Sequence, residues 1–370
     1  MRTKNLWVLS IIFVGLAIFN PVIGQGNKYK RRAGGNKNVS KYTGQSAGKF
    51  RSYDYLGVGI NALNYYGDLA PLSRAASTDV SFTRPGIGIT YGKRAFEQVS
   101  LRLNYNFGRI KGDDISSQDD SRLARNLSFR NNIHEMNVGL NIYFLPDGNA
   151  PSFRSPFNIY LFIGAGFFLH DPKGKVPDYD YQLYGPDAAG QGVEKLPNAG
   201  EWVKLRELRT EGQGQTFEGI DTPPIYKPFE WNIPVNLGAL FTIPRTPFNV
   251  HFELGYRFLF TDYLDDVSNN YVNLSRFDND LSRIMSDRSV EPTNGFGSVN
   301  RNLDAINIAQ QNIDGTSYYV AIDNGSGQDG SIRGNPKNND VYFVTQIKLT
   351  YIIPPTGISR GGRRSSAKFR

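Results

Sequence analysis

Eight segments of the chain alternate strictly between apolar residues and polar or small ones. In the segment 99–107 every odd-numbered position is apolar, from Val99 to Phe107, whereas the positions between them hold Ser, Arg and Asn. Successive side chains of a β-strand point to opposite faces, so each segment has one apolar and one polar face. The pattern predicts strands at about 55–66, 86–91, 99–107, 133–144, 157–169, 229–243, 248–260 and 341–353.

The connections between these strands are alternately short and long. Short turns are predicted at 92–98, 145–156 and 244–247, and long loops at about 67–85, 110–132, 171–228 and 261–340. Outer-membrane barrels combine strands of about ten residues with short periplasmic turns and longer extracellular loops. The sequence therefore predicts an all-β fold over 53–353: an eight-stranded antiparallel transmembrane outer-membrane β-barrel with long extracellular loops and both termini in the periplasm. The alternative, a soluble sandwich, would have to cover the apolar face of all eight strands.

Composition supports secretion to the cell envelope. The first 24 residues resemble a signal peptide, because Arg2 and Lys4 precede the apolar run 6–19 and the small-residue site 22–24. The chain has no cysteine, which excludes disulfides, thiolate metal ligands and cysteine nucleophiles, and also a lipid-modified cysteine. Its mean hydropathy of −0.42 argues against a helical membrane protein. We expect the cell outer membrane as its location and membrane lipid as a neighbour.

Both predicted periplasmic segments are strongly basic. The N-terminal segment 25–52 and the C-terminal tail 354–370 are rich in Gly, Ser, Lys and Arg, a composition that cannot bury a core by itself. One interpretation is that they dock on an acidic periplasmic partner; the other is a solvated tail that attracts anionic headgroups. A periplasmic location argues against nucleic acid as the partner. The candidate contact residues are Lys28, Lys30, Arg31, Arg32, Arg363 and Arg364.

Five charged side chains are predicted to point into the barrel, namely Arg102, Glu135, Glu253, Arg257 and Lys348. An eight-stranded barrel is just wide enough to be filled by its own side chains, and buried charges need partners. Counting residues up from the periplasmic turns puts Glu253 level with Lys348, and Glu135 level with Arg257. The pattern therefore predicts interior ion pairs, with a polar conduit as the alternative.

Candidate catalytic residues are few. The segment 44–48 (GQSAG) matches the G-x-S-x-G pattern of serine hydrolases, which works only on a strained turn between a strand and a helix. Here it stands in a basic linker before the first strand. The three histidines, His134, His170 and His251, are not spaced as a metal site or a catalytic triad. We therefore expect no enzyme activity, no cofactor and no small-molecule substrate.

An acidic cluster follows the seventh predicted strand. Asp262, Asp265 and Asp266 are close enough in sequence to hold a calcium ion together with loop carbonyls. The alternative is that Asp262 caps a short helical turn while the other two face water. Later in the same loop, apolar residues at helical spacing predict a helix within 274–288.

Four loop motifs together resemble a known family. They are Tyr66-Gly67-Asp68-Leu69, Thr210-Glu211-Gly212-Gln213-Gly214, the segment 261–268 (TDYLDDVS), and Arg333-Gly334-Asn335 followed by Asn339-Asp340. Their order and placement are similar to the PorG-type outer-membrane barrels of Bacteroidetes, a domain family otherwise of unknown function.

The resemblance covers about 53–353. It implies an accessory role in type IX protein secretion and gliding motility, with contacts to a periplasmic ring made of a lipoprotein and its partner subunit. The alternative is a surface adhesin or receptor that acts through the long loops.

Overall fold

The computed structural model describes residues 50–69, 84–117, 119–148, 154–217, 222–322, 328 and 330–353. The predicted signal peptide, nearly all of segment 25–52, the GQSAG motif and the C-terminal tail lie outside these ranges. Their boundaries stay predictions.

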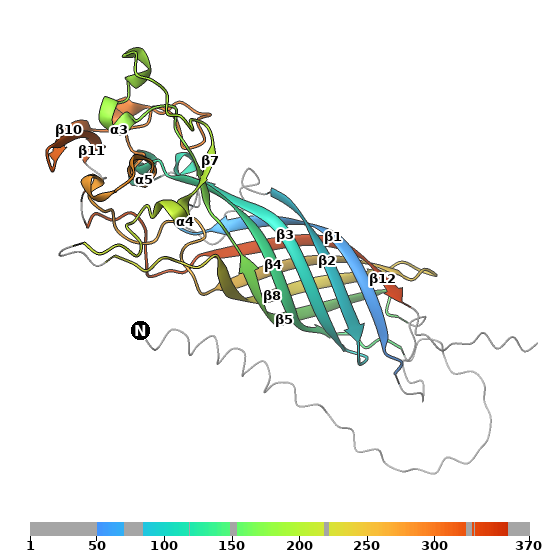
Figure 1. Cartoon of the computed structure of the whole chain (residues 1–370). Coiled ribbons are helices and arrows are strands. Elements are labelled where there is room, and N and C mark those ends of the chain that lie inside the picture. The colour runs from blue at the N-terminus through green and yellow to red at the C-terminus, as the bar shows by residue number, and fades with distance from the viewer. Residues whose placement is uncertain are drawn as a thin grey trace, which may run out of the picture. The chain divides into compact units, whose positions relative to one another are not determined.

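Eight long strands form a closed barrel (Figure 1). They are β1 (Tyr53–Tyr66), β2 (Arg84–Arg94), β3 (Val99–Asp113), β4 (Ser128–Tyr143), β5 (Phe157–Leu169), β8 (Phe229–Thr242), β9 (Phe248–Leu259) and β12 (Val341–Ile353). Their order around the barrel is β3-β2-β1-β12-β9-β8-β5-β4, and β3 pairs with β4 to close it. Every pairing between these strands is antiparallel. The predicted eight-stranded antiparallel barrel is confirmed.

Long connections leave one end of the barrel and fold into a cap above it (Figure 1). The cap contains the short strands β6 (Lys173–Lys175), β7 (Trp202–Lys204), β10 (Ile308–Ile313) and β11 (Thr316–Ala321). Its helices are α2 (Asp120–Arg125), α3 (Tyr181–Tyr184), α4 (Leu205–Leu208) and α5 (Asp280–Ser286), and its 3₁₀ turns are η2 (Asp114–Ser116), η4 (Ala188–Gly190), η5 (Leu274–Arg276) and η6 (Leu303–Ala305). In the described residues, no helix has the length and apolar character needed to cross a membrane.

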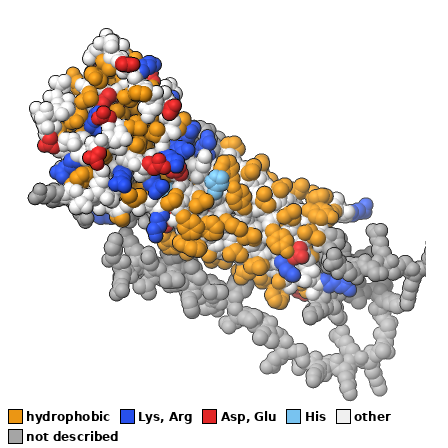
Figure 2. Space-filling view, viewed as in Figure 1, with side chains coloured by type: hydrophobic (Ala, Val, Ile, Leu, Met, Phe, Trp, Pro, Cys, Tyr) orange, Lys and Arg blue, Asp and Glu red, His pale blue; other side chains and the backbone are white. Residues whose placement is uncertain are grey.

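The barrel wall is apolar outside and polar inside. Outward side chains such as Val58, Val138 and Leu237 are exposed to 60%, 48% and 54%, whereas the inward Asn137 is 2% exposed. Figure 2 shows hydrophobic side chains, here called the apolar belt, covering most of the visible face of the barrel. An exposed apolar surface of this extent, on a closed barrel without free strand edges, is the structure that spans lipid. The protein is an outer-membrane β-barrel, with the cap at the extracellular end.

Of the eight barrel strands, β3 and β4 extend furthest beyond the limits that the sequence pattern predicted. The third strand was expected to end at Phe107 and the fourth to begin at Ile133, but β3 reaches Asp113 and β4 starts at Ser128. Above the membrane the polarity reverses. The inward Ile110 and Phe129 are fully buried, whereas outward positions carry basic residues. The apolar-outside rule that identified the strands no longer holds there.

Apolar side chains close the extracellular mouth of the barrel. Residues of the strands, such as Leu63, Phe129 and Tyr342, form one buried cluster with Leu264 and Met285 of the cap. The opposite end is closed by smaller aromatic clusters, which contain Tyr53, Tyr55, Ile352, Tyr143, Tyr160 and Leu240. The charged layer of the barrel interior therefore lies between two layers of large side chains.

Candidate functional site

The structure brings together both charge pairs that the residue count put at one level. Arg257 of β9 donates to Glu135 of β4 through Nε at 2.5 Å and Nη2 at 3.2 Å. Asn106 and Asn232 donate to the same carboxylate at 2.9 and 2.8 Å. This bidentate pair joins two strands that are not neighbours, so it spans the barrel interior.

The second pair is part of a larger cluster. Oε1 of Glu253 lies 2.5 Å from Lys348 Nζ and 2.6 Å from Arg102 Nη1, and Asn236 donates to Oε2 at 3.0 Å. The hydroxyl of Tyr160 also donates to Glu253. Sequence reasoning placed Arg102 inside but gave it no partner, because side-chain reach across the lumen cannot be read from strand register. Both interior clusters fill the lumen with paired charges.

The four motifs of the family resemblance meet in one buried network at the extracellular mouth, which we call the mouth network. Arg333 donates to Glu211 Oε1 at 2.9 Å and to the carbonyl oxygen of Asp266 at 2.7 Å. Glu211 Oε1 in turn accepts from the backbone N–H of Ser268 at 2.9 Å. Residues of three motifs, far apart in sequence, thus share a few hydrogen bonds.

Carboxylates of the same motifs continue the network. The Tyr65 hydroxyl, one residue before the first motif, lies 2.5 Å from Asp265 Oδ2 and 3.0 Å from Asp340 Oδ1. Asp340 Oδ2 accepts from the Leu264 N–H at 2.9 Å, and Asp68 Oδ2 accepts from the Asn335 N–H at 2.6 Å. Tyr65 was not singled out in the sequence, where only its place beside the first motif could have marked it.

Two motif glycines are explained by close packing. A Cβ on Gly67 would lie 1.9 Å from Asp340 Oδ1 and 2.0 Å from the Tyr65 hydroxyl, and one on Gly334 would lie 2.6 Å from the Ser268 nitrogen. Any larger residue would push these segments apart. The glycines allow the backbone to approach the network directly.

The structure does not gather the carboxylates of the acidic cluster around one point, as the calcium hypothesis would require. Asp262 accepts from Ser268 Oγ at 2.7 Å, Asp265 from the Tyr65 hydroxyl, and Asp266 from the Tyr226 hydroxyl at 2.7 Å. The three carboxylates therefore point to different partners, and no group of metal-ligating residues occurs in the described part of the chain. The alternative is wrong, since no helix begins at Asp262 and both Asp265 and Asp266 are buried.

Burial raises the pKa values of these carboxyl groups. It raises the pKa of Asp262 to about 9, and nearby Asp265 and Asp68 add to the effect. Burial also raises the pKa of Asp266 to about 7, although Arg333 opposes the shift. The pKa values of Asp265 and Asp340 are raised by burial and by neighbouring carboxylates. Carboxyl groups that share protons can pack closely without a cation.

The three histidines lie in separate environments. His134 is on the outer surface of β4, where its Nδ1 is 2.9 Å from the Tyr105 hydroxyl. His251 is inside the barrel, hydrogen bonded to Tyr160 and Thr350. His170 is buried in the cap, stacked with Tyr226, and burial lowers its pKa to about 4.

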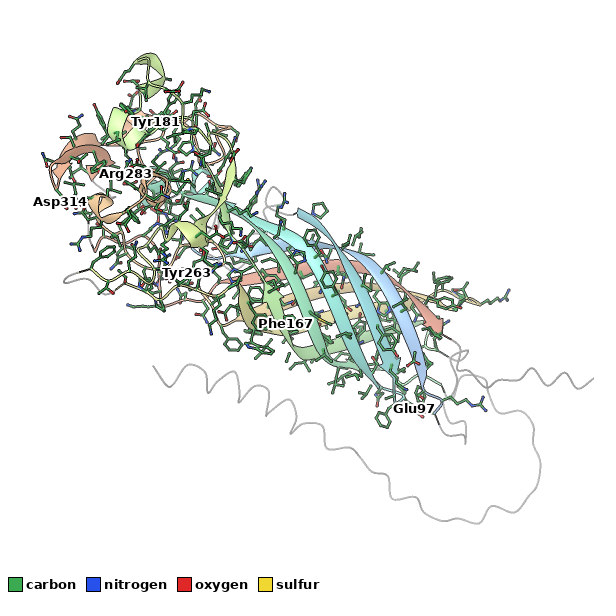
Figure 3. All side chains as sticks on the ribbon, viewed as in Figure 1. Glu97, Phe167, Tyr181, Tyr263, Arg283 and Asp314 are labelled. Atoms are coloured by element: carbon green, nitrogen blue, oxygen red, sulfur yellow. The ribbon has the colours of Figure 1, made fainter. Side chains whose placement is uncertain are left out.

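The cap also encloses a small polar cavity of about 120 Å³. Its lining includes Lys175, Asp178, Tyr181, Arg288, Glu291 and Asn294. Arg288 is fixed there by a bidentate ion pair with Glu291, at 2.7 and 2.8 Å. In Figure 3 Tyr181 and Arg283 lie in the cap, Tyr263 lies at its base near the barrel, and Glu97 lies at the opposite end of the barrel.

Known proteins give limited similarity. No curated protein matches the sequence. Among solved structures, Ail of Yersinia pestis aligns with 6% identity and a TM-score of 0.31, over 82% of this chain and all of Ail. The neisserial surface protein NspA aligns with 9% identity and a TM-score of 0.31, over 81% of this chain and 98% of NspA. OprG of Pseudomonas aeruginosa gives 10% identity and the same TM-score, over 83% of this chain and 98% of OprG.

A family model matches part of the sequence. It covers β1 to β5 and the start of the third long loop, and so includes the first resemblance motif but not the other three. Residues 48–180 of this outer-membrane β-barrel match the domain of unknown function DUF6089.

Proposed function

We propose that this protein is a non-enzymatic structural barrel that serves as an accessory component of type IX protein secretion and contacts a periplasmic ring complex. The observation that carries the proposal is the mouth network, in which all four motifs of the PorG-type resemblance take part. The four motifs on which the resemblance rests therefore belong to one hydrogen-bonded network. The match of 48–180 to DUF6089 is compatible with such a family.

The filled lumen supports a scaffold rather than a channel. Arg102, Glu253 and Arg257 are each 1% exposed, and Tyr160 and Phe162 are fully buried. Transport through such an interior would require breaking buried ion pairs, which costs several kcal/mol for each pair. A barrel of this kind acts through the surfaces at its two ends.

The periplasmic end would supply the ring contact. The basic tails have a composition that suits an acidic partner surface, and their residues 25–49 and 354–370 lie outside the described part of the chain. They are joined to the barrel at the end opposite the cap, where β1 begins and β12 ends. The proposed partners are the lipoprotein of the ring and its partner subunit.

The test replaces Lys28, Lys30, Arg31, Arg32, Arg363 and Arg364 with Ser in the full-length protein. Barrel insertion should stay intact, whereas co-purification of periplasmic ring subunits and export of type IX cargo should fall. The association of the wild-type protein with the ring subunits should weaken as the salt concentration rises. The reason is that salt screens the attraction between charges beyond a Debye length of about 8–10 Å. Unchanged cargo export after deletion of the whole gene would refute the proposal.

A second candidate is a surface adhesin or receptor, and the ordered cap with its polar cavity favours it. Here the long loops would carry the function. Exchange of the cap segment 269–334 for a short Gly/Ser linker should then abolish surface binding, while the tail variant should have no effect. The reverse pattern would favour secretion.

A further inference from the structure

A row of four basic residues crosses four strands on the outer face of the sheet that supports the cap. Lys111 of β3 is paired with Arg130 of β4, Arg130 with Lys173 of β6, and Lys173 with Lys204 of β7. Directly paired residues point to the same face of a sheet, with Cβ atoms about 5 Å apart. Four positive charges at successive positions repel each other, so the row, here called the basic row, needs a reason to exist.

The row faces outward rather than into the cap. Ile110 and Phe129, which alternate with Lys111 and Arg130, are fully buried in the mouth of the barrel. A Cβ on Gly174, next to Lys173, would contact Met285 and Leu205 of the interior. All four basic side chains keep solvent access.

The row stands directly above the apolar belt. Along the outward face of β3, Leu101, Leu103 and Tyr105 are exposed apolar residues, followed by Phe107 and then by Arg109 and Lys111. At about 3.3 Å per residue, Arg109 and Lys111 lie roughly 7 and 13 Å along the strand beyond Phe107. The headgroup region is about 5–8 Å deep on each side of the hydrocarbon. Because strands of such barrels are tilted, the basic side chains reach headgroup height.

Aromatic rings hold two of the basic groups in place. The Arg130 guanidinium lies 3.7 Å from the Trp202 ring centroid, and Lys111 Nζ lies 5.4 Å from that of Phe296. The two rings are in contact, with centroids 5.7 Å apart. Such cation–π contacts position the two charges at the surface, where both side chains are partly exposed.

Lys204, at one end of the row, has acidic neighbours: its Nζ lies 2.8 Å from Glu207 and 3.9 Å from Asp171. Arg109, outside the row and exposed, adds a further cation beside Arg130 and donates to Asn132 at 2.7 Å. The β3–β4–β6 side thus carries four basic residues close together. Figure 2 shows Lys and Arg side chains gathered where the hydrophobic belt meets the cap.

We infer that the basic row, with Arg109, is a binding site for the phosphate groups of a phosphorylated glycolipid in the outer leaflet. Its acyl chains would lie against the apolar belt below, while its phosphates would meet Lys111, Arg130 and Lys173. Arginine suits bidentate phosphate contacts and lysine acts as a point charge. A soluble polyanion has the same charge but no acyl chains, and only a lipid matches a basic surface that continues into a lipid-facing one.

The test uses the full-length protein in nanodiscs of zwitterionic lipid. Purified lipid A carrying both phosphates is titrated in, and Trp202 fluorescence reports on binding beside Arg130. The double variant Arg130→Gln/Lys173→Gln removes two charges from the row. The matched control, Lys93→Gln/Arg245→Gln, removes two exposed charges at the opposite end of the barrel. Retained heat-modifiable mobility shows that each variant is folded.

The double variant should lose about 25-fold in affinity, since each basic residue at an anionic membrane surface contributes about fivefold. The control should bind as the wild type does. Dephosphorylated lipid A should bind the wild type weakly. This comparison requires no variant protein. Equal affinity of the double and control variants, equal binding of the dephosphorylated lipid, or full displacement by a soluble sulfated polysaccharide would each overturn the proposal.

Discussion

Glu211 and Arg333 are 122 positions apart in the chain and form a 2.9 Å ion pair in which both side chains are at most 2% exposed. Glu211 belongs to the third long loop and Arg333 to the fourth, so the pair ties the two largest parts of the cap together above the barrel. Arg333 also donates to the Ser286 carbonyl at 3.2 Å, at the end of α5. The two residues therefore hold the cap as one unit.

Removing one partner of this pair should loosen the cap and spare the barrel. Arg333→Met leaves the Glu211 carboxylate buried without its cation, which costs about 3–5 kcal/mol. We expect faster hydrogen exchange and proteolysis in the cap, with unchanged heat-modifiable mobility of the barrel. As a control, Lys195→Met removes an exposed ion pair with Asp178, which is worth less than about 1 kcal/mol. Equal protease resistance of the two variants would contradict this role.

The stability of the cap should fall as pH rises. Burial raises the folded-state pKa of Asp262 to about 9 and that of Asp266 to about 7, while unfolded Asp titrates near 3.9. Between these values the native state keeps protons that the unfolded state has released. The stabilisation from these protons is complete below about pH 4 and is lost as pH rises through 7 towards 9.

Hydrogen exchange of cap amides measures this dependence after correction for the intrinsic effect of pH on exchange. The cap should be more protected at pH 5.5 than at pH 8.5. Asp262→Asn imitates the protonated carboxyl group and should flatten the dependence. A slope that is the same in wild type and variant would show that Asp262 does not titrate in this range.

Substitution of Glu253 should destabilise the barrel more than substitution of either Arg102 or Lys348 alone. Glu253→Gln leaves both Arg102 and Lys348 without the carboxylate that they share, at a cost of about 3–5 kcal/mol. The double variant Glu253→Gln/Lys348→Met removes one unpaired charge and should recover part of that loss. The stabilities of the single and double variants are measured by refolding into detergent, with heat-modifiable gel mobility as the readout of folded protein. Additive costs of the single changes would mean that the residues do not interact.

The lipid-facing assignment predicts a dependence on depth. Leu140 is 43% exposed near the middle of the belt. The substitution Leu140→Arg should lower the free energy of unfolding by about 2–4 kcal/mol. Phe144→Arg, at the periplasmic rim and 57% exposed, should cost at most about 1 kcal/mol. Folding yield into lipid vesicles distinguishes the two. Comparable yields would mean that the belt does not face hydrocarbon.

The sequence by itself determined the barrel. The alternating pattern in segments such as 157–169 and 341–353 placed β5 and β12 to the residue, because lipid on one face and the barrel interior on the other impose a period of two. It also put Glu135 near Arg257, and Glu253 near Lys348, although the register of β9 and β12 pairs Glu253 with Gln346, two residues from Lys348. Alternation and residue counts are local properties, so they can be read from a single chain, whereas the exact register is set by pairing between strands.

Only the tertiary structure decided what happens above the membrane. Water surrounds the wall there, so the rule of apolar outward residues ends and the extensions of β3 and β4 escaped prediction. Cap contacts such as Tyr65 with Asp340 join residues 275 positions apart, and no periodicity encodes them. The acidic cluster shows the same limit: three nearby aspartates suggested calcium, but the backbone turns each carboxylate towards a different donor. Side-chain direction in an irregular loop is set by the fold as a whole.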